Sequence, residues 1–86
     1  MIYTLIQRRR SLRRPVNTAA WIERDNSHLL ERCTLIDISE KGARLSINDI
    51  HDLPTYFKLH LVRGAQQFHE CRVVWRKRND VGVEFV

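Results

Sequence analysis

The sequence predicts an all-β protein, a six-stranded antiparallel barrel preceded by a flexible basic N-terminal arm. Short strand-like stretches are separated by turn residues, and no stretch shows convincing helical periodicity. A chain of 86 residues can bury only one modest core. In so small a sheet, closure into a barrel removes exposed edges that would otherwise pair with other chains. We expect residues 1–16 to form the arm and residues 17–86 to form the barrel.

The first three strands are expected at residues 18–23, 29–38 and 43–47. Apolar residues fill the middle of the first. In the second, the alternation places Cys33 and Leu35 on one face and Ile38 on the other. Polar residues and Gly42 then interrupt the strand, and Gly42 is expected to supply either a positive φ or a close backbone approach.

The last three strands are expected at residues 56–62, 67–77 and 81–85. In the fourth, Phe57 and Leu59 alternate with Lys58 and His60, a pattern typical of a half-buried strand. Turns are predicted at residues 63–66 and at 79–80, so the last strands form hairpins.

Composition excludes several classes of protein. No apolar run is long enough to span a membrane, and the basic run follows the first apolar patch instead of preceding it, as it would in a secretory signal. We therefore expect a cytoplasmic protein. Cys33 and Cys71 lack the spacing of a zinc or redox motif and are expected to be reduced core thiols. With scattered histidines and no pairing of a nucleophile with a base, we expect no metal, no catalytic residues and no enzyme activity.

Positive charge is concentrated in the arm. The chain has 15 Lys and Arg against 10 Asp and Glu, and five of the arginines lie between Arg8 and Arg14. Arg9 and Arg13 are four residues apart, as are Arg10 and Arg14, so either pair shares one side of the chain. Guanidinium groups bind phosphate oxygens and the edge of guanine. The alternative is a solvated basic tail with no specific ligand.

A second candidate site lies at the end of the second expected strand. Asp37 and Ser39 are two residues apart and point the same way on an extended chain. A carboxylate can accept hydrogen bonds from the N–H groups of guanine, and Gly42 would let the backbone approach a ligand. The alternative is a turn in which Asp37 and Ser39 bond to local backbone.

Together the two stretches resemble the PilZ domain family, which is marked by an RxxxR arm followed by a [D/N]xSxxG turn. The arm is QRRRSLRRPV at residues 7–16, and the turn is within DISEKGARL at residues 37–45. The end of the chain, CRVVWRKRNDVGVEFV, is similar to the family's closing hairpin. The resemblance implies a six-stranded barrel that binds the bacterial second messenger cyclic di-GMP, with no other cofactor.

The resemblance also implies the ligand-binding residues, which are Arg8, Arg9, Arg10, Arg13, Asp37, Ser39, Gly42 and Trp75. Arg9 and Arg13 match the RxxxR arginines, although the pair Arg10 and Arg14 stays open as an alternative register. An arginine immediately before RxxxR, the place of Arg8, goes with two intercalated ligand molecules in this family. Trp75 is expected either to line the site or to lie in the core.

We therefore expect a cyclic di-GMP receptor or adaptor in which the ligand orders the arm and so changes the surface offered to a protein partner. One rival is a small basic barrel that binds single-stranded nucleic acid, although the charge of the barrel without the arm is balanced. The other is a PilZ-like interaction domain without a ligand. Because the chain ends at Val86, the helix that follows the last strand in many PilZ domains is expected to be absent.

Overall fold

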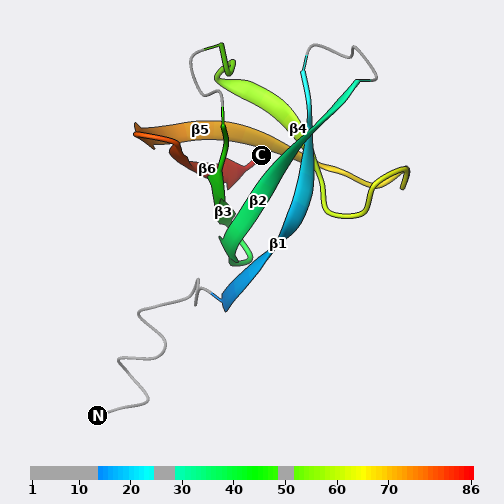
Figure 1. The fold of residues 1–86 in the computed structure, drawn as a ribbon, viewed down its shortest axis with the longest axis horizontal. Coiled ribbons are helices and arrows are strands. Elements are labelled where there is room, and N and C mark those ends of the chain that lie inside the picture. The colour runs from blue at the N-terminus through cyan, green and yellow to red at the C-terminus, as the bar shows by residue number, and fades with distance from the viewer. Residues whose placement is uncertain (1–13, 25–28, 49–51) are drawn as a thin grey trace.

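The computed structural model of the chain describes residues 14–24, 29–48 and 52–86. Six strands account for most of them (Figure 1). They are β1 (Arg14–Glu23), β2 (Leu30–Ile38), β3 (Gly42–Ser46), β4 (Tyr56–His60), β5 (His69–Lys77) and β6 (Asp80–Phe85). All six expected strands are therefore present, and the described residues contain no helix.

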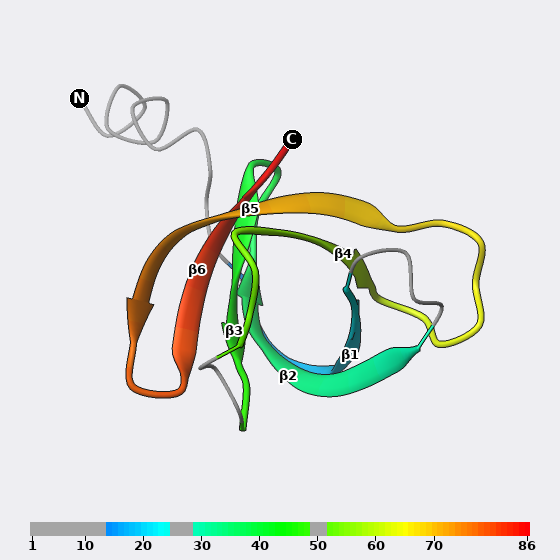
Figure 2. The same ribbon diagram turned by 90° about the horizontal axis from the view of Figure 1, so that it is seen from above.

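The strands form one closed antiparallel barrel in the order β1-β2-β3-β6-β5-β4. Figure 2 shows β1 to β4 curving around the interior, with the long strand β5 crossing one side. The barrel is closed by a short seam in which Trp21, Ile22 and Glu23 of β1 pair with residues of β4. The predicted fold class is confirmed. Within the described ranges, no helix is long and apolar enough to cross a membrane.

The core is formed by the inward-facing side chains of all six strands. Ile47 and Leu53 extend it into the connection between β3 and β4. Cys33 and Cys71 are both free and buried, as expected. The remaining buried hydrophobic residues are Ala20, Ile22, Leu35, Ala43, Leu45, Phe57, Leu59, Val81 and Val83.

Strand β1 begins earlier than expected. The sequence predicted a strand from Thr18, but Arg14 and Pro15 already pair with Ile38 and Asp37 of β2. The register shifts between Pro15 and Thr18, where Asn17 has a φ of 48°. Such a bulge accommodates a proline, which has no N–H to donate to a regular ladder. The chain before Arg14 is thus joined to the sheet directly beside Asp37.

Further bulges change which residues face the core. The β2–β3 register shifts between Leu35 and Asp37, and the β5–β6 register shifts between Val73 and Trp75. Each bulge reverses the alternation that follows it. As a result, Ile38 packs against the core, and the prediction that it lies on the face opposite Cys33 and Leu35 was wrong.

Candidate functional site

The turn between β2 and β3 is built by Ser39 and Gly42. The N–H of Ser39 donates to the carbonyl oxygen of Gly42 over 2.8 Å, and the Ser39 hydroxyl donates to the same oxygen over 3.3 Å. The hydroxyl also accepts from the N–H of Lys41 over 3.3 Å. Both hydroxyl distances are long for hydrogen bonds, so a ligand can compete for this group at little cost. Ser39 therefore stabilises the turn, while its hydroxyl group can still form a hydrogen bond with a ligand.

Gly42 is required for packing within the barrel. A Cβ atom on this residue would lie 2.1 Å from the carbonyl oxygen of Val83 on β6. Its φ is not positive, since Gly64 is the glycine with a positive φ among the described residues. Of the two expected roles, the close approach is the correct one, but the neighbour is the backbone of β6.

Asp37 lies near the end of β2, between β1 and β3. Its register partners are Pro15 on β1 and Arg44 on β3. Because the bulge precedes Asp37, this residue shares the outer face of the barrel with its partner Arg44, which is exposed. The carboxylate is half-buried and stands beside the point where the arm joins the sheet.

The same register continues across the barrel to Trp75. Arg44 pairs with Gly82 on β6, and Gly82 pairs with Trp75 on β5. We call these four residues, Asp37, Arg44, Gly82 and Trp75, the outer row. Trp75 is 41% exposed, so it lines the surface of the barrel and is not a core tryptophan. Its indole lies over Gly82, where a Cβ atom would be 2.0 Å from the indole Nε1.

Sequence reasoning missed Arg44 as a member of this surface. Its guanidinium carbon is 5.8 Å from the centroid of the Trp75 ring. The Nη2 and Nε atoms both donate to Asp80 Oδ2, over 2.6 and 3.2 Å. The alternation of Arg44 with buried Ala43 and Leu45 does indicate an outward side chain. That Arg44 lies near Trp75, however, depends on β-bulges that could not be predicted from the sequence.

Comparison with known protein families shows to which family the barrel belongs. A model of the PilZ domain matches residues 7–86, which is nearly the whole chain. The chain belongs to the PilZ domain family. PilZ domains are in general cyclic di-GMP receptors rather than enzymes. A search of curated proteins found no match.

Placed on this PilZ barrel, the expected site residues fall into two groups. Asp37, Ser39 and Gly42 come together at one turn, and Trp75 lies along the outer row from Asp37. The four arm arginines, Arg8, Arg9, Arg10 and Arg13, lie outside the described residues. The alternative pair is half described, because Arg14 is the first residue of β1 and is exposed.

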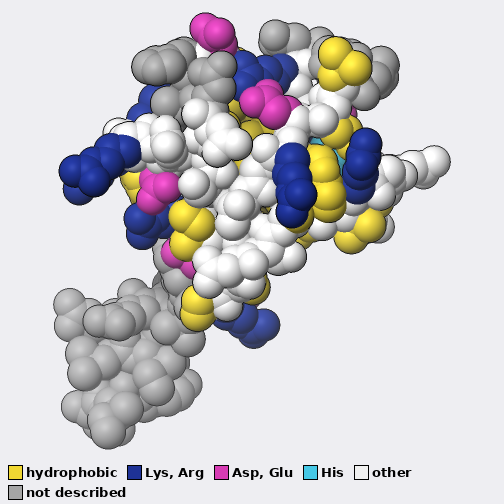
Figure 3. Space-filling model, in the orientation of Figure 1, with side chains coloured by type: hydrophobic (Ala, Val, Ile, Leu, Met, Phe, Trp, Pro, Cys, Tyr) yellow, Lys and Arg dark blue, Asp and Glu magenta, His cyan; other side chains and the backbone are white. Residues whose placement is uncertain are grey.

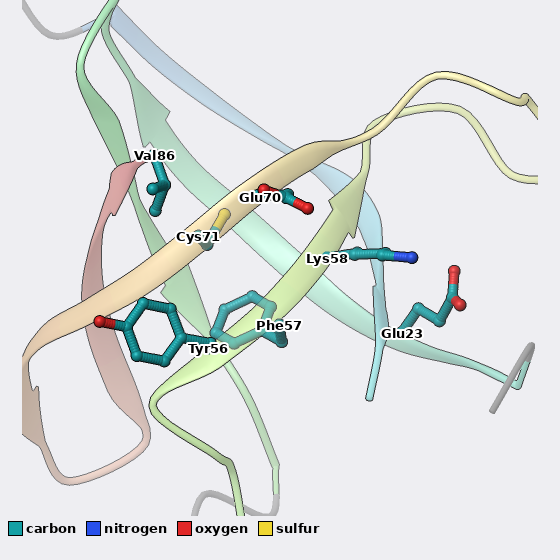
Figure 4. A pocket seen from close by; sticks show the side chains of 7 residues that line it. All are labelled: Glu23, Tyr56, Phe57, Lys58, Glu70, Cys71 and Val86. Carbon is teal, nitrogen blue, oxygen red and sulfur yellow. The ribbon is translucent and has the colours of Figure 1, made fainter. Parts of the chain in front are cut away.

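One hollow of the PilZ barrel lies elsewhere. It is a groove of about 380 Å³ along β4 and β5, between Glu23 at the end of β1 and Val86 at the end of the chain (Figure 4). None of the expected ligand residues lines it; its residues are Glu23, Tyr56, Phe57, Lys58, Glu70, Cys71 and Val86.

The two cysteines of the barrel are buried, and burial changes their pKa values. Burial raises the pKa of Cys33 to about 12, with the Glu31 carboxylate adding to the effect. Burial likewise raises the pKa of Cys71 to about 12. Both thiols are therefore protonated at neutral pH and are poor nucleophiles. Among residues 14–24, 29–48 and 52–86, no three His, Cys, Asp or Glu side chains gather into a metal site.

Proposed function

We propose that this PilZ domain is a receptor for cyclic di-GMP that binds the ligand between the basic arm and the β2–β3 turn. The observation that supports this most strongly is the register of Pro15 with Asp37. Arg13 precedes Pro15 by two residues in the sequence, so the RxxxR stretch leads directly into the residue of β1 that pairs with Asp37 of the [D/N]xSxxG stretch.

The two halves of the proposed site offer complementary chemistry. The arm supplies guanidinium groups, which bind phosphate oxygens and the acceptor edge of guanine. The Asp37 carboxylate accepts from the N–H groups of guanine, and the weakly engaged Ser39 hydroxyl adds a further contact. A carboxylate would repel a bare phosphate surface, so the combination favours a guanine nucleotide over an unspecific polyanion.

The balance of charge supports the same ligand over single-stranded nucleic acid. Apart from the five arginines between Arg8 and Arg14, ten Lys and Arg residues are balanced by ten Asp and Glu residues. In Figure 3, the basic side chains of the barrel stand apart from one another among hydrophobic and uncharged atoms. A binder of single strands usually carries its positive charge along a continuous groove.

In the proposed mechanism the ligand changes the arm and not the barrel. Like charges repel one another along the arm, and phosphates relieve this repulsion by forming charge-assisted hydrogen bonds. The arm then folds over the outer surface of the barrel and presents a new surface to a protein partner. No reaction follows, so the signal is carried by binding alone.

Calorimetric titration with cyclic di-GMP at physiological salt tests the proposal. We expect saturable binding at micromolar concentrations, with two ligands per chain if Arg8 supports an intercalated pair. Arg13→Ala is expected to abolish binding because it removes an RxxxR guanidinium. A wild-type protein that gives no saturable heat would refute the proposal.

The matched control is Lys77→Ala. Lys77 is an exposed cation, the last residue of β5, and pairs with Asp80. Its replacement by alanine changes the net charge by the same amount as Arg13→Ala. We expect this variant to bind like the wild type. If Lys77→Ala weakens binding as much as Arg13→Ala, or if single-stranded DNA competes with the ligand, net charge is responsible and the proposed site is wrong.

A further inference from the structure

We infer that the free edge of β5 is a docking site for an acidic, extended segment of a protein partner, which adds to the barrel as a further strand. The free edge consists of residues 74–77, the last four residues of β5. The inference goes beyond the proposed function and does not depend on cyclic di-GMP, since the edge is complete in the barrel alone.

Strand β5 has neighbours on both sides along its first half only. β4 pairs with it from His69 to Arg72, whereas β6 pairs with it as far as Lys77. Figure 2 shows the end of β5 at the outside of the barrel, with β6 beside it and no strand beyond it. Among the described strands, residues 74–77 of β5 therefore pair with β6 alone.

Arg76 presents its backbone at this edge. Lys77 and Asp80 flank the two-residue turn of the β5–β6 hairpin, a position at which opposite residues exchange hydrogen bonds. Bonded and non-bonded pairs alternate along an antiparallel ladder, so the next pair, Arg76 with Val81, is a non-bonded one. The N–H and C=O groups of Arg76 therefore point away from β6, where an added strand can bond to both.

The charges of the edge fit an acidic partner. Arg76, Lys77 and Arg78 are consecutive, exposed cations, and none of them forms an ion pair with a described residue. By contrast, Arg44 and Arg72 on the neighbouring surface are each held by a carboxylate. Like charges on facing strands repel, so the three cations disfavour a second copy of the same edge and favour a strand that carries carboxylates.

The two faces of the edge determine the sequence that it fits. Arg76 lies opposite buried Val81 and Trp75 lies opposite Gly82, so the two side chains stand on opposite faces of β5. Val74 and Trp75 are 47% and 41% exposed, although both are apolar. An added strand meets a cation on one face and an indole on the other, so its carboxylates should alternate with apolar side chains.

The probe is an acetylated and amidated peptide of eight residues, in which glutamate alternates with valine. We expect saturable binding to the whole chain without cyclic di-GMP, followed by NMR. Exchange of the Arg76 N–H with water should slow about tenfold when nine-tenths of the protein is occupied, because only the free tenth then exchanges. The Lys77 N–H already faces β6, so it is the internal control and should keep its rate.

Two control peptides separate strand addition from attraction between charges. Lysine in place of every glutamate is expected to abolish binding, because the peptide then has the same charge as the edge. Proline in place of one central valine keeps the charge but interrupts the added strand, so this peptide is also expected not to bind.

A matched pair of variants tests the position of the edge. Arg76→Glu should weaken binding of the probe about fivefold or more, since it replaces an attractive pair of facing charges by a repulsive one. Arg32 is likewise an exposed cation, but it lies on β2, away from the edge. Arg32→Glu makes the same change of charge and should bind the probe within twofold of the wild type.

Failure of this inference is distinguishable from failure of the receptor. If the probe does not bind, or binds without slowing exchange at Arg76 because it contacts the arm instead, the docking site is wrong. It is equally wrong if the proline peptide or single-stranded DNA slows that exchange as the probe does, since charge alone is then sufficient. Neither result bears on the titration with cyclic di-GMP, which tests the arm and the β2–β3 turn.

Discussion

Gly42 shows how the fold itself can require a residue of the motif. It is buried at the start of β3, and its backbone lies against the carbonyl group of Val83 on β6. The same close approach fixes the turn whose Ser39 hydroxyl we propose as a ligand contact. A glycine at this position of the motif is therefore explained by packing before any ligand is considered.

Gly42→Ala is expected to lower the free energy of unfolding by about 1–3 kcal/mol, the usual cost of forcing an extra methyl group into a packed interior. The new Cβ would meet backbone, which cannot turn away as a side chain can. Urea unfolding followed by circular dichroism measures the loss. Ser46→Ala, on the same strand but facing outward, should change stability by less than about 0.5 kcal/mol. An unchanged unfolding midpoint for Gly42→Ala, with ligand binding lost, would assign this glycine to the ligand alone.

At the scale of the strands, the alternation of apolar and polar residues predicted where the strands lie. The β-bulges decided which side chains face outward. All six strands could be located from apolar periodicity and turn residues, because a period of two is visible in short stretches. The bulges before Asp37 and before Trp75 could not be located, since they depend on pairing between strands distant in the sequence. The [D/N]xSxxG motif therefore predicted that Asp37 lies at the site, but Arg44 belongs to no motif and its neighbourhood was not predicted.

The seam between β1 and β4 contains a buried histidine that the alternation of residues in β4 did not predict. His60 was expected on the solvent face, yet it is only 6% exposed, and its Nε2 lies 2.9 Å from Glu23 Oε1. The ring of Phe68 covers it, with centroids 5.7 Å apart. Within the described part of the chain, His60 Nδ1 has no hydrogen-bond partner. The pairing of β1 with β4 is the shortest strand pairing in the barrel, and a buried polar pair links these two strands.

Glu23→Ala is expected to destabilise the barrel by about 1–3 kcal/mol, because it leaves the Nε2 side of a buried ring unsatisfied. Glu23→Gln keeps an acceptor for His60 and should cost less. Chemical denaturation of both variants measures the difference. Glu31→Ala is the control, since it removes a carboxylate from the more exposed pair with Arg24 and should cost no more than about 1 kcal/mol. Equal losses for Glu23→Ala and Glu31→Ala would show that the buried pair does not secure the seam.

At the scale of the whole molecule, the hydrophobic core and the arginines of the proposed site lie in different parts of the chain. Every residue of the hydrophobic core cluster lies between Ala20 and Val83, whereas the concentrated positive charge precedes Pro15. Substitutions in the arm should therefore alter binding without altering the fold. In the proposed receptor, the outer face of the barrel and the arm act together only when a ligand bridges them.

This separation makes thermal unfolding a test of the complete receptor. A ligand at 100 times its dissociation constant stabilises the folded state by about 2.7 kcal/mol, which for a domain of this size raises the melting temperature by on the order of 10 °C. Arg13→Ala should melt at the wild-type temperature without ligand and show no rise with it, because the core is intact while the bridge is lost. A lower melting temperature for the free variant would mean that the arm belongs to the fold. An undiminished rise would mean that the barrel binds the ligand without the arm, since only a bridged ligand requires both parts.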